Sequence, residues 1–227
     1  MKDVKMINGY PFIRYTREPV TDVDLVMRSD AFYQSLSQRR SVRDFSNQSF
    51  PLEVIENIIR TASTSPSGAN KQPWSFCVVQ DKQLKREIRL AAEKEEQTSY
   101  ESRMSEEWLE DLKPLQTDWQ KPFLEIAPYL IVVFKKAYDL QADGSKKHNY
   151  YVNESVGLAC GFLLAAIHQA GLVALTHTPS PMNFLVSLLH RPDNERPFLL
   201  IPVGRPHPDA RVPDIGRKKL EEVMTLY

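Results

Sequence analysis

The chain has 227 residues, of which 42% are hydrophobic, so it is long enough to bury one substantial core. Its 29 lysine and arginine residues equal its 29 aspartate and glutamate residues, and the formal net charge is therefore zero. No overall field favours nucleic acid or a membrane surface, so binding through bulk charge is excluded. Charge must act locally in this protein.

Membrane insertion and export are not expected. The longest apolar run, over residues 158–166, is well short of the roughly 20 residues that a spanning helix needs. Residues 1–15 lack the apolar core and cleavage site of a signal peptide. Cys77 and Cys160 lie within apolar segments, which predicts reduced core residues, and the histidines show no metal-ligand spacing. We therefore expect a cytoplasmic protein without a metal.

Residues 1–30 contain prolines and charges without a sustained period, which predicts an extended arm. Asp30 is expected to cap a short helix that runs to Arg39. The next helix opens at Ser49 and Pro51, and its apolar residues recur at the helical period over residues 52–62. It ends at the small residues 65–68.

The segment Trp74–Val79 is rich in β-branched and aromatic residues and predicts a strand. Residues 82–120 follow as a charged helical region whose apolar face fades after Ala91. The continuous apolar run Tyr129–Phe134 is typical of a central strand that is covered on both faces.

A helix is predicted over Glu154–Ala170, apolar nearly all round, with Gly171 as its C-terminal cap. Such a helix belongs in the core or at a subunit interface. Two further strands are expected over 173–176 and 198–203, with a helix over 184–189 between them. The pattern predicts one α+β domain with terminal arms, which often wrap a partner subunit.

Four short motifs are candidates for chemistry. The first, Arg39-Arg40-Ser41-Val42-Arg43, suits a phosphate dianion, although it also fits a solvated basic helix end. The second, residues 65–70, has the small residues that let backbone amides approach a ligand, or that form a plain connector. No dinucleotide-binding, P-loop or serine-hydrolase motif is present.

The third motif, Thr176-His177-Thr178-Pro179, places hydroxyls directly after a predicted strand, where they fit either a ligand contact or an ordinary strand end and turn. The fourth comprises Glu96 and Tyr100, one helical turn apart, with Lys121 further on. By themselves these three residues equally describe a solvated face.

The order and the residues of the motifs resemble those of the flavin-dependent nitroreductase superfamily: R-R-S-V-R, a helix, P-S-G-A, and P-W-S-F as a strand. From about Tyr33 onward the chain is similar to the iodotyrosine deiodinase family within it. That similarity includes Thr176-His177-Thr178-Pro179, Pro202-Val203-Gly204 and Val212-Pro213-Asp214.

The resemblance implies the α+β nitroreductase fold, with a central mixed sheet flanked by helices and an intertwined homodimer that binds two FMN molecules at its interface. It also implies a cofactor-binding set that holds the phosphate, the ribityl chain and the flavin edge. The set is Arg39, Arg40, Ser41, Arg43, Pro66, Ser67, Gly68, Thr176, His177, Thr178 and Arg217.

For activity, the resemblance implies reductive removal of iodide or bromide from halotyrosines in one-electron steps. The hydroxyl of Thr178 would lie beside the flavin N5, and the backbone amide of Ala69 would hold the substrate phenolate. Glu96, Tyr100 and Lys121 would grip the amino-acid zwitterion, since a carboxylate suits an ammonium group and a lysine suits a carboxylate. Residues 92–122, with few apolar anchors, are expected to form a mobile lid.

The chain departs from the vertebrate pattern in lacking an N-terminal anchor and in carrying His177 where a threonine is usual. Two other functions remain open. One is a general nitroreductase or quinone reductase driven by NAD(P)H, which needs none of the three zwitterion residues. The other is a flavin-binding sensor that does not turn over. The electron source for the main prediction is a reductase or NAD(P)H.

Overall fold

The computed structural model describes residues 3–227, and the chain divides into two compact units, Met1–Gln38 and Arg39–Tyr227. Residues 1–2 of the expected arm lie outside the described residues. No helix within residues 3–227 combines the length and the apolar character that crossing a membrane requires.

The first unit is more regular than an extended arm. Strands β1 (Val4–Ile7) and β2 (Tyr10–Ile13) form an antiparallel hairpin. Its turn is Asn8-Gly9, with φ angles of 49° and 83°, a pair that favours tight hairpins. Helix α1 (Asp22–Ser37) begins earlier than the expected helix at Asp30, because Thr21 caps it by accepting a hydrogen bond from the Asp24 amide.

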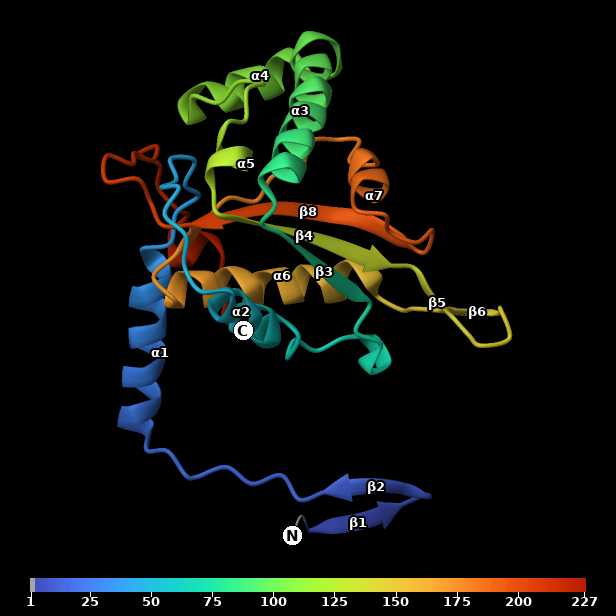
Figure 1. Ribbon diagram of the computed structural model, residues 1–227. Helices are drawn as coiled ribbons and strands as arrows, with labels where there is room; N and C mark the ends of the chain where they lie inside the picture. Colours follow the sequence, from blue (N-terminus) through green and yellow to red (C-terminus); the bar gives the residue numbers. More distant parts are fainter. Residues whose placement is uncertain (1–2) are drawn as a thin grey trace. The chain divides into compact units, whose positions relative to one another are not determined.

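The second unit is built on a four-stranded sheet with the order β3-β4-β8-β7 (Figure 1). These strands are β3 (Trp74–Val79), β4 (Tyr129–Lys136), β8 (Glu195–Gly204) and β7 (Val173–Ala174). Every named pair is antiparallel. Within the described residues the sheet is mixed only through a parallel bridge between Ser41 and Ala174. The expected central strand is confirmed, since β4 lies between β3 and β8.

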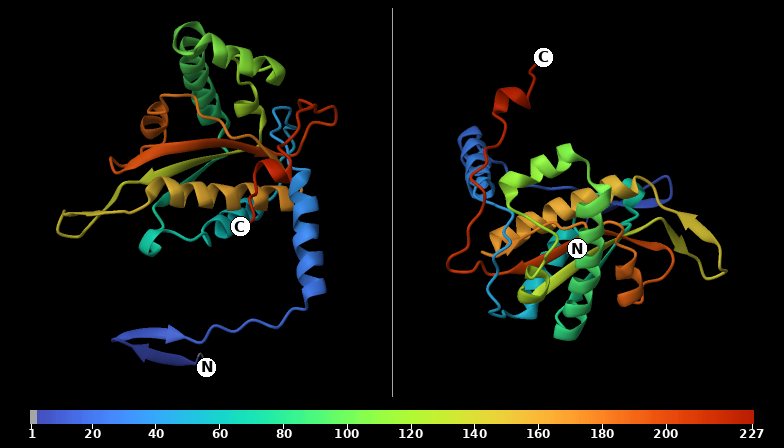
Figure 2. Two further views of the ribbon diagram at one scale, coloured as in Figure 1. Left: turned by 180° about the vertical axis from the view of Figure 1, so that it is seen from behind. Right: turned by 90° about the horizontal axis from the view of Figure 1, so that it is seen from above.

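Helices cover both faces of this sheet, as the two views of Figure 2 show. On one face α2 (Leu52–Ala62) and α6 (Val152–Gln169) pack against alternate β4 residues such as Ile131 and Val133. On the other face α3 (Lys82–Thr98), α5 (Phe123–Ile126) and α7 (Phe184–Leu188) cover Leu130, Val132 and Phe134. The two-residue period of a strand distributes this apolar run between two cores.

The charged region after residue 82 is interrupted rather than continuous. Helix α3 passes into a single π-helical turn at Ser99–Arg103, followed by α4 (Glu106–Leu112) and 3₁₀ turn Lys113–Leu115. Helix α6 lies within two residues of its predicted ends, and Gly171 follows it with a φ of 74°. The hairpin of β5 (Tyr138–Leu140) and β6 (Lys146–His148) was not predicted. The remaining 3₁₀ turns are Gly68–Asn70 and Leu220–Glu222.

Candidate functional site

The arginine segment meets the C-terminal segment. The guanidinium group of Arg40 donates to the Pro213 carbonyl, and Arg217 Nη2 donates to the Arg39 carbonyl at 2.8 Å. The Val42 amide also donates to Ala174 O at 3.2 Å, which ties the segment to the sheet edge. The fold therefore brings Arg217 to the cluster Arg39–Arg43, although 173 or more residues separate them in sequence.

Arg39, Arg40 and Arg43 have no direct ion-pair partner in the part of the chain that the structure describes. Burial lowers the pKa of Arg43, while the charges of Tyr100 and Asp44 act in the opposite direction. Such a group of guanidinium donors is well suited to a phosphate.

A second polar group is buried between α3, the segment before α5 and the segment that follows β7. Lys121 Nζ lies 3.5 Å from Glu96 Oε2, and His177 Nε2 lies 4.0 Å from Glu96 Oε1. The side chains are 4%, 11% and 9% exposed for Lys121, Glu96 and His177. Lys121 Nζ also lies 5.6 Å from the centre of the Tyr100 ring. The predicted zwitterion residues are thus brought together.

Burial sets the protonation behaviour of this group. It raises the pKa of Glu96 and lowers the pKa of Lys121, and in each case the charge of the other residue opposes the effect. It also raises the pKa of Tyr100. Burial, together with the positive charges of Lys121 and Arg43, lowers the pKa of His177 to about 3, so the imidazole is neutral at pH 7.

Two backbone groups that the sequence did not reveal support these side chains. Tyr100 Oη donates to the Thr117 carbonyl at 3.1 Å, and Lys121 Nζ donates to the Asp118 carbonyl. The Lys121 amide donates to Glu93 Oε1 at 2.8 Å. Carbonyl acceptors leave no signal in a residue pattern, so only the fold shows them.

The Thr176-His177-Thr178 motif follows β7, which ends at Ala174 rather than at the expected Thr176, and His177 forms an isolated β-bridge with Leu200. Thr176 and Thr178 are exposed, whereas His177 is buried and exchanges two backbone hydrogen bonds with Leu200, at 2.9 and 3.0 Å. His177 therefore faces away from the two hydroxyls and toward Glu96 and Phe123. Thr176, His177 and Thr178 were all predicted to contact the cofactor, but the His177 side chain points to the opposite side from the two threonines.

The small-residue loop is held in an unusual conformation. Ala69, Asn70 and Gln72 have φ angles of 49°, 53° and 47°, which L-residues rarely adopt. The Gly68 amide donates to Ser155 Oγ at 3.3 Å and the Gln72 amide to Ser67 Oγ at 2.9 Å. Within residues 3–227 the Ala69 amide has no such acceptor. A strained loop thus presents one free amide, as an anion-binding loop requires.

Gly68 is required for close packing. A Cβ atom at this position would lie 3.0 Å from both the Tyr150 carbonyl and the Tyr151 ring, at the start of α6. Gly68 thus lets the loop reach the N-terminal end of that helix, where Ser155 Oγ accepts a hydrogen bond from the Gly68 amide.

The predicted residues fall into two groups at opposite ends of the sheet. Figures 1 and 2 show the 68–70 turn near the start of β3, whereas residues 39–49 and the C-terminal segment lie where β8 ends. No hydrogen bond or ion pair found within the described chain joins residues 66–70 to the arginines or to the Glu96 group. One chain therefore does not assemble the whole predicted site.

Residues 92–122 are anchored to the rest of the unit by a few polar contacts. Arg103 Nη1 lies 2.9 Å from Glu95 Oε2 and donates to the Ser180 carbonyl at 3.1 Å. Trp108 on α4 is 53% exposed, and no residue of α4 is buried. The segment has little apolar surface to hold it down.

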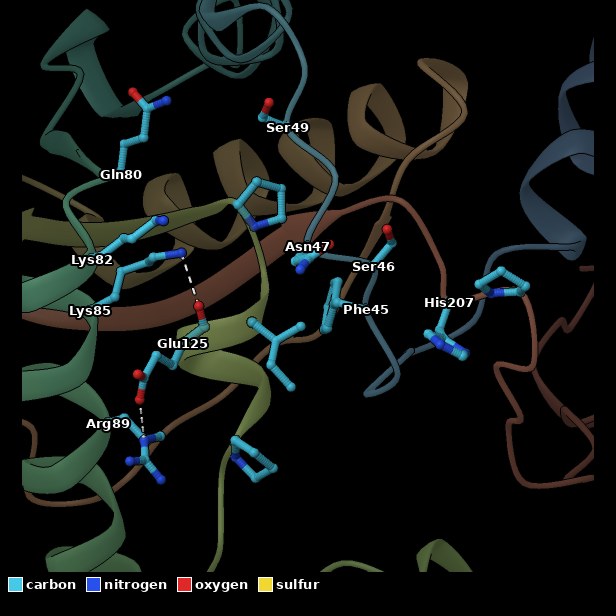
Figure 3. A pocket seen from close by; sticks show the side chains of 14 residues that line it. Phe45, Ser46, Asn47, Ser49, Gln80, Lys82, Lys85, Arg89, Glu125 and His207 are labelled. Atoms are coloured by element: carbon cyan, nitrogen blue, oxygen red, sulfur yellow. Dashed lines mark hydrogen bonds and ion pairs between the residues drawn. The ribbon is translucent and has the colours of Figure 1, made fainter.

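The groove in Figure 3 has a volume of about 990 Å³ and none of the predicted site residues lines it. Two of its cations, Lys85 and Arg89, already have partners. Lys85 Nζ donates to the carbonyls of Glu125 and Ala127 at 3.0 and 2.6 Å, and Arg89 Nε lies 2.8 Å from Glu125 Oε2. We assign no ligand to this groove.

Comparison with known proteins shows which family the chain matches and which proteins are similar to it. Residues 36–205 match the model of the nitroreductase family. Iodotyrosine deiodinase of Haliscomenobacter hydrossis is 65% identical over 216 residues, 95% of this chain and 97% of the relative. Iodotyrosine deiodinase 1 of Homo sapiens is 46% identical over 213 residues, covering 93% and 74% respectively.

A solved structure agrees with these relatives. The crystal structure of oxidized iodotyrosine deiodinase bound to FMN and 3-iodo-L-tyrosine aligns with a TM-score of 0.74 and 34% identity. The alignment covers 86% of this chain and 98% of that one.

Proposed function

This chain belongs to the nitroreductase family, and from that membership we propose that it is an FMN-dependent oxidoreductase that converts 3-iodotyrosine and related halotyrosines to tyrosine and halide. The names of the relatives support this activity. The observation that carries it in this chain is the buried group of Glu96, Tyr100 and Lys121, which a reductase without an amino-acid substrate does not need.

The residues present fit FMN. Arg39, Arg40 and Arg217 meet in one place and offer guanidinium donors to the phosphate, with Ser41 and Arg43 beside them. Pro66, Ser67 and Gly68 would line the flavin, and the exposed residues Thr176 and Thr178 would offer it their hydroxyls, with Thr178 as the donor to its N5 atom. Bound FMN supplies the electrons for reductive dehalogenation.

The zwitterion of the substrate replaces an internal ion pair. Glu96 accepts from the ammonium group, while Lys121 and the Tyr100 hydroxyl bind the carboxylate. The two charged residues already lie 3.5 Å apart and are almost inaccessible to solvent, so a ligand that supplies both charges leaves neither of them unpaired. The Ala69 amide holds the phenolate oxygen.

A second copy of the chain completes this site. The 66–69 loop of one protomer lies far from its own arginines, and a homodimer allows it to meet those of the partner. Helix α6 offers a surface for the contact: Leu158 and Phe162 are 51% and 39% exposed, and nothing lies within 4 Å of a Cβ placed at Gly157 or Gly161. Apolar side chains beside glycines suit close helix packing.

Residues 92–122 act as the lid in this proposal, since they carry Glu96, Tyr100 and Lys121 and have few buried anchors. Electrons reach the flavin from a reductase or from NAD(P)H. We further propose a cytoplasmic location, where the free thiols of Cys77 and Cys160 stay reduced.

Iodide release from 3-iodotyrosine tests the proposal. The FMN-loaded protein is reduced with dithionite, and the wild type is compared with Lys121→Ala and with Lys113→Ala, whose lysine side chain is 66% exposed. We expect Lys121→Ala to raise KM by roughly 10- to 100-fold, because a charged hydrogen bond is lost, and Lys113→Ala to behave as the wild type.

The opposite result has a clear meaning. If the wild type releases no iodide but reduces nitroaromatic compounds with NADPH, the chain is a general nitroreductase and the substrate assignment is wrong. If it binds flavin but performs neither reaction, a sensor function takes its place.

A further inference from the structure

His177 is fixed in position more firmly than a mobile polar residue. Its amide and carbonyl both bond to Leu200, at 2.9 and 3.0 Å. Its ring lies edge-on to Phe123 with 5.7 Å between ring centres, and the residue is 8% exposed. The imidazole therefore cannot move far to find a partner.

The Nε2 atom of this fixed ring has no hydrogen-bond partner within the described chain. The nearest carboxylate atom is Glu96 Oε1 at 4.0 Å, about 1 Å beyond hydrogen-bond reach. The other oxygen of Glu96 faces Lys121 Nζ at 3.5 Å. The Glu96 carboxylate thus lies between Lys121, which it contacts, and His177, which is just out of hydrogen-bond reach.

Lys121 can move away from Glu96 and still keep hydrogen-bond acceptors for its ammonium group. Its Nζ also lies 3.3 Å from Thr117 Oγ1 and donates to the Asp118 carbonyl. Glu96 has no comparable second partner among the described side chains other than His177. When a ligand carboxylate draws Lys121 away, the Nε2–H of a neutral His177 is the donor left within reach.

We infer that His177 is a positioning residue of the substrate site, which donates Nε2–H to Glu96 once an amino-acid ligand engages Lys121, and so holds the carboxylate toward the ligand ammonium group. The inference rests on the proposed function and deepens it. It gives a role to a side chain that faces away from Thr176 and Thr178 and that needs no contact with the flavin.

The test is a comparison of dissociation constants on the FMN-loaded protein. The ligands are 3-iodotyrosine and its analogue without the carboxylate group, which leaves Lys121 on Glu96. The variants are His177→Leu, which fills the space without a donor, His177→Gln, which retains an N–H near the Nε2 position, and Phe123→Leu, which alters only the packing of the ring. Each histidine variant is also combined with Glu96→Gln.

We expect His177→Leu to weaken the binding of 3-iodotyrosine by about tenfold and to leave the affinity of the analogue within about twofold, because the lost hydrogen bond forms only when a ligand carboxylate draws Lys121 away from Glu96. His177→Gln should restore most of the affinity. In the Glu96→Gln background the effect of His177→Leu should shrink to about twofold or less. Phe123→Leu should weaken both ligands alike.

Equal weakening of both ligands by His177→Leu would show that the residue only packs, and would overturn the inference. If the wild type itself binds both ligands equally, the zwitterion site fails and the inference fails with it. Nitrogen-15 NMR of the wild-type imidazoles provides a measurement that needs no folded variant. The Nε2 signal of His177 should shift on adding 3-iodotyrosine and stay unchanged with the analogue; the reverse would overturn the inference.

Discussion

Glu96, Tyr100 and Lys121 illustrate how far single residues can be read from the sequence. Their charges agree with an amino-acid ligand, yet their spacing equally describes a solvated face, and only the resemblance to a family selected the ligand role. The fold adds the decisive property, burial: a carboxylate and an ammonium group lie 3.5 Å apart and are almost inaccessible to solvent. Burial of a residue in an irregular segment depends on packing from elsewhere, so no local pattern predicts it.

The pH dependence of stability should report the buried imidazole. The folded pKa of His177 is about 3 against an ordinary value of 6.5, so its contribution is complete above pH 6.5 and is lost as the pH falls toward 3. His177→Phe should remove up to about 1.4 kcal/mol per pH unit from the slope of unfolding free energy in that window. Urea unfolding at several pH values with saturating FMN measures it.

The exposed His207, with a side chain 53% accessible, supplies the matched control as His207→Asn. If His177→Phe and His207→Asn show the same slope as the wild type, then the imidazole of His177 is charged or solvated in the folded protein.

Among the elements, those with a buried face were predictable and the others were not. Helix α2 buries residues that recur at the helical period, and strand β4 buries a continuous apolar run. Both patterns can therefore be recognised in the sequence. Helix α1 has no buried residue, and no apolar period marks it. The β1–β2 hairpin did carry a signal, Asn8-Gly9, that the arm interpretation overlooked.

The strained 68–70 turn makes a prediction at this scale. Ala69→Gly should raise the free energy of unfolding by about 0.5–1 kcal/mol, because glycine adopts a φ of 49° without a Cβ clash. The affinity for 3-iodotyrosine should not change, since the proposed contact is made by the backbone amide. Urea unfolding and ligand titration measure the two effects.

Ala91→Gly in the middle of α3 is the control, and it should lower the free energy of unfolding by about 1 kcal/mol. A loss of stability in Ala69→Gly of the same size would mean that the turn is not strained.

The lid proposal is tested at Arg103, which joins the π-helical turn to Glu95 and to the Ser180 carbonyl. Arg103→Ala should speed chymotrypsin cleavage within residues 104–122 and raise KM for 3-iodotyrosine about three- to tenfold, with little change in kcat. Arg86→Ala, at an exposed residue of α3, should leave both unchanged. Unaltered cleavage in Arg103→Ala would remove this contact from the lid.

At the scale of the whole molecule, the order of motifs along the chain conceals their separation in space. The 66–69 loop directly precedes β3 and the arginines precede α2, yet they lie at opposite ends of the sheet. Sequence order does not reveal this, because the direction in which a strand crosses the sheet is decided by its pairing with distant strands. The resemblance implied a homodimer, and the fold adds a physical reason for it, because one chain holds the two parts of the site apart.

Leu158→Asp tests that dimer. A charge on the exposed face of α6 should produce monomers in analytical ultracentrifugation and release FMN, because each flavin site would lose its second half. Leu90→Asp on α3 is the matched control, since Leu90 and Leu158 are both 51% exposed. A dimer that survives Leu158→Asp with full flavin content would place the contact between copies elsewhere.

The position of β8 in the sheet has a consequence for biosynthesis. Residues 195–204 form an inner strand, paired with β4 on one side and β7 on the other, although they come near the end of the chain. Until the ribosome has released them, the apolar run of β4 has an open edge, and its paired residues are more than 50 positions apart in sequence on either side. Such nonlocal pairing is slow and exposes aggregation-prone surface. The yield of soluble protein during overexpression should therefore depend on keeping nascent chains from associating with one another before β8 has paired.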